Sequence, residues 1–320
     1  MKKLQSLILA ILWSTGIAFS ASSGTCGEDL TWTLDDDGVL TIRGTGAMTS
    51  YSYYGAPWYS YGFASSSSLV IEDGVTSISD YAFTDGYLLT SIEIPESVTS
   101  IGSYAFQHCT SLTSITIPES VTSIGSCAFS GCTSLTSITV SEGNTAYASV
   151  DGVLYTYDMT ELICYPASKT DTSFTIPDAV TSIGSYAFYK CTSLTSITIS
   201  ESVTSISSWA FSGCTSLTSV TIPDSVTSIG SYAFYRCTKL TSITIPDAVT
   251  SIGSYAFYYC SSLTSVTSLA TTPPTCSGDP FSSSTYSSVT LTAASKLYQY
   301  AEYWKKFSTI EYTEPNFHPL

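Results

Sequence analysis

The chain has 320 residues, of which 25 are acidic and 10 are basic, giving a formal net charge of −15. This excess of negative charge excludes nucleic acid and anionic membrane surfaces as favourable partners. Only 11% of the residues are charged, so Ser, Thr and Tyr supply most of the polarity and we expect a surface dominated by hydroxyl groups.

The first 20 residues have the pattern of a secretory signal peptide. Two lysines precede the apolar run from Leu7 to Trp13, and Ala18 and Ser20 are small residues suited to a cleavage point. The run is too short to span a bilayer, which takes about 20 apolar residues. We predict that residues 1–20 are a signal peptide and that the mature chain is exported, with no integral membrane segment.

Residues 21–68 are predicted to form a cap at the start of a repeat array. Alternating apolar residues run from Trp32 to Ile42 on both sides of the segment Asp35-Asp36-Asp37-Gly38. Asp and Gly favour tight turns, so this stretch predicts a β-hairpin. Three aspartates also suggest calcium, but no glutamate stands at the spacing of a calcium loop, which favours the turn.

Residues 69–270 repeat a unit of 23 residues. The Ala-Phe pair of the unit recurs every 23 residues except once, where an insertion of 36 residues intervenes; its phenylalanines are Phe83, Phe106, Phe129, Phe188, Phe211, Phe234 and Phe257. Repeats of this length are typical of solenoids, in which each unit buries its apolar face against its neighbours. The sequence therefore predicts a β-rich repeat solenoid.

Within one unit, Ile115 and Ile117 alternate with Ser and Thr. A period of two predicts a short strand with one buried face, and Pro118, which has no N–H, ends it. Equivalent strands are predicted to stack in parallel about 4.8 Å apart. The repeat position of Gly102 is occupied by Ser in two other units, at Ser79 and Ser207. We therefore expect a bend there that has room for a small side chain and does not need left-handed backbone.

Six of the ten cysteines occupy one position of the unit. An exported protein favours disulfides, but stacked residues have parallel Cβ atoms that do not converge as a disulfide requires. We therefore favour a column of buried thiols, and no metal site, because ligands along a line do not surround a tetrahedral ion. The state of Cys26, Cys127, Cys164 and Cys276 is left open. The column is Cys109, Cys132, Cys191, Cys214, Cys237 and Cys260.

The two remaining segments differ from the repeat. Residues 141–173 contain the insertion, with two apolar stretches at 151–155 and 162–166. Residues 271–320 are predicted to be a C-terminal cap and tail. In that cap Ser295 can begin a helix whose buried face would hold Leu297, Tyr300, Ala301 and Trp304.

The segment Leu240–Cys260 carries the repeat motif in full, with Leu, Ile, Ile, Pro, Val, Ile, Gly, Ala-Phe and Cys in register. This motif resembles the BspA-like bacterial leucine-rich repeats. The stretch from Cys26 to Met48 is similar to the leader hairpin that precedes such arrays, and the insertion is similar to the family's extra hairpin unit, which implies an inserted hairpin at about 141–173. The resemblance implies a right-handed leucine-rich-repeat solenoid with a parallel strand stack, an N-terminal β-hairpin cap and a C-terminal helical cap. It also implies attachment to host or neighbouring-cell surfaces, and hence secretion or display on a bacterial cell.

Catalytic chemistry has few candidate residues. The two histidines are His108, at a variable and outward position of the unit, and His318, in the tail. Serines are abundant, but none has an evident base. We therefore predict no enzymatic activity, no catalytic residue, no cofactor and no metal ligand.

The exposed side of the strands is the predicted binding face. Concave strand faces of solenoids commonly bind partners, and this one is nearly uncharged and suited to hydrogen bonding with an extracellular protein or glycan. We predict an adhesion scaffold; the alternatives are a glycan-binding surface and an ice-binding type of ordered-water surface, which needs a flat sheet. The predicted ligand-binding residues are Glu93, Ser114, Thr116, Thr139, Ser196, Thr198, Ser219, Thr221, Ser242 and Thr244.

Two further columns repeat once per unit. The aromatic column is predicted to be half-buried packing, with sugar stacking as the alternative; it comprises Tyr81, Tyr104, Tyr186, Trp209, Tyr232 and Tyr255. The acidic column is predicted to be solvated because like charges repel; it comprises Glu96, Glu119, Asp178, Glu201, Asp224 and Asp247.

Overall fold

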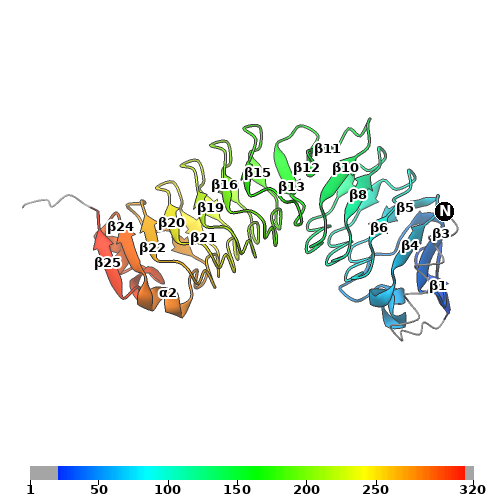
Figure 1. Ribbon diagram of the computed structural model, residues 1–320, viewed down its shortest axis with the longest axis horizontal. Helices are drawn as coiled ribbons and strands as arrows, with labels where there is room; N and C mark the ends of the chain where they lie inside the picture. Colours follow the sequence, from blue (N-terminus) through cyan, green and yellow to red (C-terminus); the bar gives the residue numbers. More distant parts are fainter. Residues whose placement is uncertain (1–20, 314–320) are drawn as a thin grey trace, which may run out of the picture. The chain divides into compact units, whose positions relative to one another are not determined.

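The computed structural model describes residues 21–313 (Figure 1). The predicted signal peptide lies outside the described residues. The chain divides between Phe129 and Ser130 into two compact units, which we describe in turn.

The first unit opens with an antiparallel cap. Strand β2 (Asp29–Leu34) pairs with β1 (Ser22–Thr25) and with β3 (Val39–Ala47), and Trp32 lies opposite Ile42. The carboxylate of Asp35 accepts hydrogen bonds from the backbone N–H groups of Asp37, at 3.1 Å, and Val39, at 2.8 Å. The predicted hairpin is confirmed, and Asp35 acts in it as a turn former. Two 3₁₀ turns follow, η1 (Pro57–Tyr61) and η2 (Phe63–Ser65).

The repeats of the first unit place two short strands in each turn of chain. The first-ladder strands precede the repeated proline, and the second-ladder strands follow it. Strand β3 pairs in parallel with β4 and β5, which joins the cap to the repeats. The first-ladder strands are β4 (Ser68–Ile71), β6 (Ser91–Ile92) and β8 (Ser114–Ile117), and the second-ladder strands are β5 (Val75–Ile78), β7 (Ser100–Ile101) and β9 (Ser123–Ile124).

The second unit contains the inserted hairpin. After β10 (Ser137–Val140), strand β12 (Val153–Thr156) pairs antiparallel with β11 (Tyr147–Val150) and with β13 (Glu161–Cys164). Strand β13 then pairs in parallel with β15, so the hairpin leads directly into the second ladder. A hairpin is therefore present in the predicted segment.

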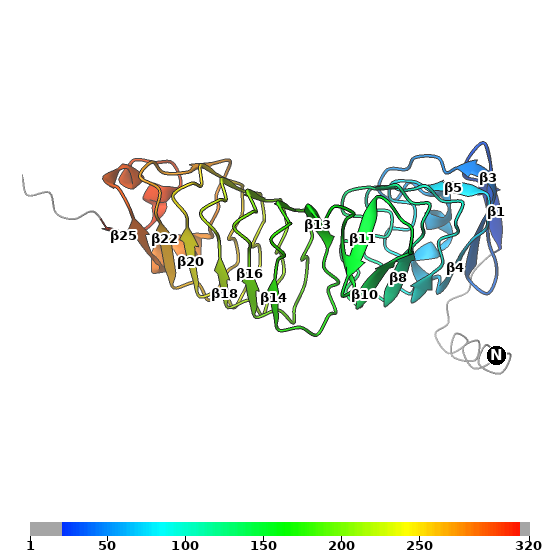
Figure 2. The same cartoon turned by 90° about the horizontal axis from the view of Figure 1, so that it is seen from above.

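Two ladders of the same kind run through the rest of the second unit, and Figure 2 shows the first-ladder strands side by side. The first ladder consists of β14 (Ser173–Thr175), β16 (Ser196–Thr198), β18 (Ser219–Thr221), β20 (Ser242–Ile245), β22 (Ser265–Ser268), β24 (Thr290–Ala293) and β25 (Thr309–Tyr312). The second consists of β15 (Ser182–Ile183), β17 (Ser205–Ile206), β19 (Ser228–Ile229), β21 (Ser251–Ile252) and β23 (Thr275–Cys276). The predicted solenoid of parallel strands is confirmed.

Stacked apolar columns form the core. The rings of Phe188, Phe211 and Phe234 stack with centroids 4.9 Å and 5.1 Å apart. The strand isoleucines lie beside them, with Ile197 and Ile243 3% and 2% exposed. Each turn thus covers the apolar face of the next, which a single 23-residue unit is too small to do alone.

The cysteine column lies in this core. The thiols of Cys214, Cys237 and Cys260 donate hydrogen bonds of 3.1–3.2 Å to the carbonyl oxygen of a phenylalanine one turn back. Burial raises the pKa of Cys260 to about 12, so its thiol keeps the proton that it donates. These residues are buried free thiols, as predicted, but they also satisfy a backbone acceptor, which we did not predict.

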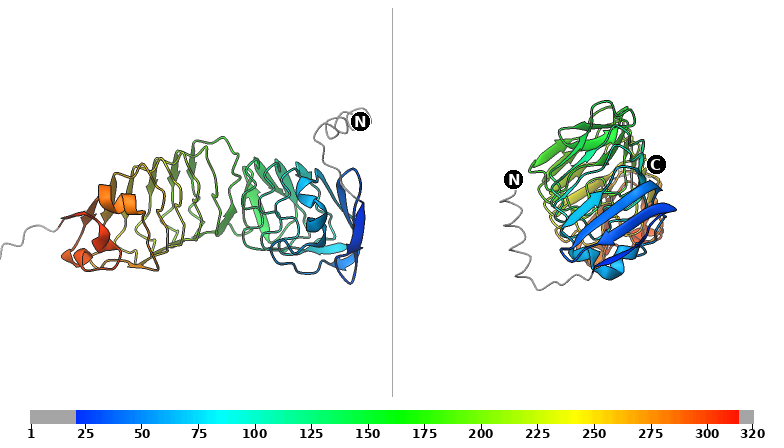
Figure 3. Two further views of the ribbon diagram at one scale, coloured as in Figure 1. Left: turned by 90° about the horizontal axis from the view of Figure 1, so that it is seen from below. Right: turned by 90° about the vertical axis from the view of Figure 1, so that its right-hand side faces the viewer.

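The C-terminal cap differs from the prediction. Its α-helix is α2 (Ser283–Ser288), and two 3₁₀ turns, η3 (Lys296–Gln299) and η4 (Trp304–Lys306), replace the helix expected after Ser295 (Figure 3). Ser295 does accept a hydrogen bond from the backbone N–H of Leu297, at 3.2 Å. However, Leu297 and Tyr300 are 54% and 75% exposed, so the predicted apolar face is wrong.

Two anchored aromatic residues and one backbone angle explain why no continuous helix follows Ser295. Tyr298 donates to the carbonyl of Ala270 at 3.0 Å, and Trp304 donates to that of Pro274 at 2.9 Å. Both side chains are fully buried. Tyr303, with φ +67°, lies between the two 3₁₀ turns, and that conformation ends a right-handed helix.

The repeated glycines are needed for close packing. As predicted, Gly102 and Gly253 do not have left-handed backbone. A Cβ atom would lie 2.3 Å from the backbone nitrogen of Asp80 at Gly102, and 2.1 Å from that of Ser231 at Gly253. The predicted room for a side chain is therefore wrong at these positions, because the backbone of the preceding turn fills it.

Candidate functional site

The strand face carries the ten predicted binding residues, divided between the two units. Glu93, Ser114 and Thr116 belong to the first unit, and the other seven belong to the second. All ten are exposed or half-buried, while the isoleucines between them are buried. In the second unit Ser196 lies opposite Ser219 and Thr198 lies opposite Thr221 in the parallel register.

Two threonine columns on the first ladder differ in what their hydroxyls contact. We call Thr195, Thr218 and Thr241 the anchoring threonines. Each Oγ1 donates to the carbonyl oxygen of the threonine 23 residues earlier, at 2.8, 3.0 and 3.3 Å. These hydroxyls therefore hold one turn against the preceding one.

We call Thr198, Thr221 and Thr244, three residues further on, the face threonines. All three are exposed. Within residues 21–313 no hydrogen bond engages their hydroxyls, so donor and acceptor capacity stays available to a ligand or to water. In the second unit the face threonines thus form an uncharged row of hydroxyls that the chain itself does not engage.

The acidic column lies at a different corner of the unit. Asp178, Glu201, Asp224 and Asp247 of the second unit are all exposed, as are Glu96 and Glu119 of the first. The prediction that these carboxylates are solvated is confirmed. Glu201, Asp224 and Asp247 follow the face threonines by three residues, so in these turns the charge lies outside the row of face threonines.

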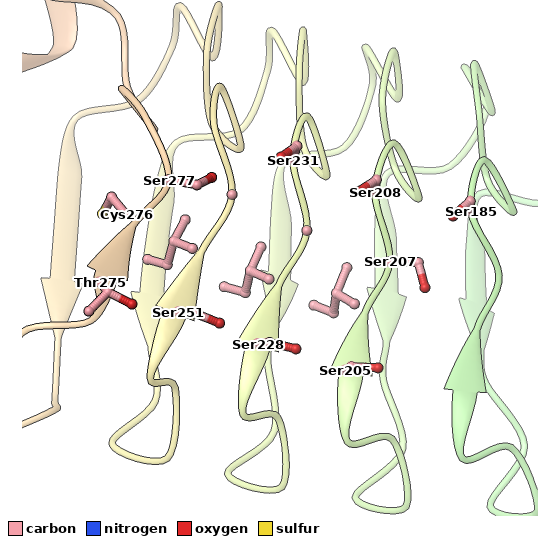
Figure 4. Close-up of a pocket in the computed structure, with 15 residues that line it drawn as sticks. Ser185, Ser205, Ser207, Ser208, Ser228, Ser231, Ser251, Thr275, Cys276 and Ser277 are labelled. Atoms are coloured by element: carbon pink, nitrogen blue, oxygen red, sulfur yellow. The ribbon is translucent and has the colours of Figure 1, made fainter.

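A serine groove along the second ladder was missed by the sequence analysis. It has a volume of about 650 Å³ and is lined by two rows of hydroxyls on either side of Ile206, Ile229 and Ile252 (Figure 4). The rows come from the repeated Ser-Ile-Gly-Ser, a signal visible in the sequence. One row holds Ser205, Ser228, Ser251 and Thr275, and the other holds Ser185, Ser208, Ser231 and Ser277.

The aromatic column has left-handed backbone at every member. Tyr186, Trp209 and Tyr232 have φ between +59° and +62° and are half-buried, as predicted, while Tyr255 is 38% exposed. Trp209 stacks on Tyr186 at 5.4 Å and on Tyr232 at 4.1 Å, with interplanar angles of 8° and 7°. The faces of Trp209 are therefore occupied by its neighbours, which disfavours sugar stacking on that ring.

His108 lies in a different environment from the one predicted. Its Nδ1 atom is 2.9 Å from Oδ1 of Asp85, a carboxylate that is only 1% exposed. Tyr53 and Tyr59 donate to the other oxygen at 3.1 and 2.8 Å. The position is variable among the repeats, and the His108 side chain is 32% exposed, but its contact with a buried acid was not predicted.

The hydrogen bonds at Asp85 stabilise its charged form. Burial would raise its pKa, but the hydrogen bonds from Tyr59, His108, Tyr87 and Tyr53 outweigh burial and hold the pKa below its usual value. The pair therefore belongs to a hydrogen-bond network that also includes Tyr53 and Tyr59.

The described residues contain neither a cluster of metal ligands nor a membrane-spanning helix. Among the described residues, no group of three or more His, Cys, Asp or Glu side chains is arranged to hold a metal ion. In the same part of the chain, no helix has the length and apolar character needed to cross a membrane.

Comparison with protein families decides the classification. The model of the BspA type leucine rich repeat region matches in six copies over residues 58–151 and 164–301, which is more than half of the chain. The chain belongs to the BspA-type leucine-rich-repeat family. Its solenoid is therefore a leucine-rich-repeat scaffold. A search of curated proteins finds no match.

Solved structures similar to this BspA-type chain are bacterial leucine-rich-repeat proteins. One, from Eubacterium ventriosum, is 27% identical over 91% of this chain and 85% of its own, with a TM-score of 0.52. The pneumococcal vaccine antigen PcpA is 21% identical over 93% and 100% (TM-score 0.62). A leucine rich cell surface protein from Faecalibacterium prausnitzii is 24% identical over 93% and 96% (TM-score 0.61). The last two support the fold alone.

Proposed function

We propose that this protein is an exported, non-enzymatic scaffold that mediates adhesion to proteins of a host or of neighbouring cells through its strand face. The observation that supports this proposal most strongly is the difference between the two threonine columns. The hydroxyls of the anchoring threonines form hydrogen bonds to the preceding turn, whereas those of the face threonines form none within residues 21–313. A repeated surface of unused donors and acceptors suits a polypeptide partner, whose backbone offers both.

The chemistry of the face also favours a spread contact. Leucine-rich-repeat solenoids offer extended surfaces, and Thr198, Thr221 and Thr244 stand on three consecutive turns. A partner that bridges several turns gains several weak hydrogen bonds, each worth about 0.5–1.5 kcal/mol. Affinity would then depend on the whole column and little on any one residue.

Export rests on the sequence pattern of residues 1–20, and display at a surface rests on the resemblance to the BspA-like family. The non-enzymatic role is supported by the family fold and by the position of His108. That imidazole contacts the buried Asp85 through Nδ1, and within residues 21–313 no hydrogen bond joins it to a serine hydroxyl.

The proposal is tested by replacing the face threonines together. Mature parent chain is screened on an array of matrix proteins and glycans, and the variant Thr198→Lys/Thr221→Lys/Thr244→Lys is then measured against each hit. Three bulky cations on exposed positions should leave circular dichroism unchanged and abolish binding to the protein hit.

A matched control adds the same charge at another repeat position, in two of the same turns and in the next one. Ser193→Lys/Ser216→Lys/Ser262→Lys uses the repeat position at which Lys239 already stands, and should bind as the parent does. If the face variant binds normally while changes in the hairpin at 151–166 abolish binding, the strand face only keeps the protein soluble and the proposal is wrong.

A further inference from the structure

A second surface of the second unit has the opposite chemistry to the strand face. Each connection from a second-ladder strand to the next first-ladder strand carries aromatic residues and, in two turns, a cation. We call this surface the aromatic ridge. It consists of Tyr186, Tyr189, Lys190, Trp209, Tyr232, Tyr235, Arg236, Tyr255, Tyr258 and Tyr259.

The rings of the ridge are packed against one another. Tyr189 stands edge-on to Tyr186 at 5.2 Å, and Tyr235 stands edge-on to Trp209 at 5.8 Å and to Tyr232 at 5.4 Å. With the stacked faces covered, the ring edges and hydroxyl groups are what a ligand can meet. Ring edges carry the positive end of the aromatic quadrupole, so the ridge favours electron-rich groups.

Two cations lie on these rings without an acidic partner. The guanidinium of Arg236 is 5.5 Å from the ring centroid of Tyr235 and 5.6 Å from that of Tyr259, and the ammonium of Lys190 is 5.3 Å from that of Tyr189. Neither cation forms a salt bridge within residues 21–313. The ridge segments 184–193, 207–216, 230–239 and 253–262 contain no Asp or Glu, in a chain with 25 acidic residues.

The backbone disfavours side chains where these cations stand. Lys190 and Arg236 occupy one position of the repeat and have φ +58°, a conformation that glycine adopts without steric cost. Gly213 fills the same position in the turn between them, with φ +76°. Glycine therefore fits this position of the fold. Lys190 and Arg236 adopt the same left-handed conformation at a steric cost that glycine would avoid.

The spacing of the charges limits the ligand. Neighbouring turns are hydrogen-bonded at this position, from Lys190 to Ser212 and from Gly213 to Tyr235. Two turns at the strand spacing place Lys190 and Arg236 about 10 Å apart along the ladder, which is about the length of a disaccharide. A dense polyanion would find too few cations and a strongly negative protein.

We propose that the aromatic ridge binds an acidic polysaccharide that carries one carboxylate per disaccharide. The chain of sugars would lie along the ladder, with successive carboxylates at Lys190 and Arg236 and its hydroxyl and ring oxygens against tyrosine hydroxyls. Arg236, held between two rings, is preorganised for a carboxylate. This site is separate from the strand face and does not depend on the function proposed for it.

The test uses hyaluronan oligosaccharides, in which glucuronate alternates with a neutral sugar, titrated into the full chain. Lys190→Gly/Arg236→Gly removes both cations while adopting the residue that Gly213 already supplies. We expect an unchanged melting temperature and an affinity at least about tenfold weaker, as for the loss of two charge-assisted contacts. Lys190→Gln/Arg236→Gln, which keeps side chains at both positions, should lose affinity equally.

Control variants distinguish the loss of cations on the ridge from the loss of positive charge elsewhere in the chain. Lys296→Ser/Lys305→Ser, which removes two exposed cations outside the ridge, should bind hyaluronan as the parent does. The proposal is overturned if the parent fails to bind hyaluronan or if both ridge variants bind as the parent does. It is also overturned if poly-L-glutamate binds equally well and is lost in parallel, since the ligand would then be an acidic polypeptide.

Discussion

One position of the repeat serves opposite purposes in the two units. In the first unit Asp85 and His108 occupy it on consecutive turns, with φ +56° and +58°, and contact each other at 2.9 Å. In the second unit Lys190 and Arg236 occupy it with Gly213 between them and contact rings but no acid. The same left-handed backbone therefore directs one pair into a buried network and the other to a surface.

This difference shows what to look for in a repeat protein. Residue type and column position are shared between structural and exposed side chains, so neither identifies a binding surface alone. The columns differ in whether the polar group of the side chain has a hydrogen-bond or ionic partner within the chain. By that criterion the anchoring threonines and the Asp85–His108 pair are structural, whereas the face threonines and the ridge cations are available to partners.

The largest expected effect is a loss of stability when the isoleucine core, which both units share, is disrupted. Ile117, which is 0% exposed, and Ile222, which is 6% exposed, are equivalent core residues. Replacing either by Ala should lower the free energy of unfolding by about 2–5 kcal/mol, because each leaves a cavity. Urea denaturation measures this loss, and a cost under about 1 kcal/mol in one unit only would show that the two cores are not equivalent.

The next effect separates the units. His108→Ala removes a donor from the buried Asp85 carboxylate and should cost about 1–3 kcal/mol, whereas Lys190→Ala, at the same repeat position, should change stability by less than about 0.5 kcal/mol. Thermal and urea unfolding of both variants check this. Equal effects would mean that the contact between His108 and Asp85 adds nothing to stability.

A smaller effect is the pH dependence that Asp85 gives the first unit. Its folded pKa lies below the usual value, so its contribution is complete above the unfolded value near 3.9. That stability is lost as the pH falls through the lower folded pKa. In urea titrations between about pH 2 and 6, Asp85→Asn should flatten the acid limb of the stability curve, and an unchanged limb would assign acid sensitivity to other carboxylates.

Much of the fold could be predicted because it repeats. The period of 23 residues, the alternation around Ile115 and the turn at Asp35 each specify local structure directly. The contact between His108 and Asp85 was missed although the two are one period apart. That column also holds Gly, Lys, Arg and Tyr, and its variety suggested an exposed position.

Other features depend on tertiary packing that no pattern records. The helix expected after Ser295 is replaced by 3₁₀ turns because Tyr298 and Trp304 are anchored to distant carbonyls. The binding residues were predicted as two columns, one of Ser and one of Thr with Glu93, and the neighbouring column of Thr195 was not considered. Only the geometry distinguishes Thr195, which bonds to the preceding turn, from Thr198, which does not.

The proposed role of the strand face is tested most directly by removing hydroxyls from each threonine column in turn. The face set is Thr198→Val/Thr221→Val/Thr244→Val, and the anchoring set is Thr195→Val/Thr218→Val/Thr241→Val. Valine keeps the branched shape that suits a strand. Both the free energy of unfolding and the affinity for the protein ligand found on the array are measured.

We predict opposite outcomes for the two sets. The face variant should keep its stability within about 0.5 kcal/mol and lose about 0.5–1.5 kcal/mol of binding free energy per hydroxyl. The anchoring variant should lose stability and keep its affinity. If instead the face variant binds as tightly as the parent, the unused hydroxyls of the strand face contact only water, and the proposed binding role of this surface is contradicted.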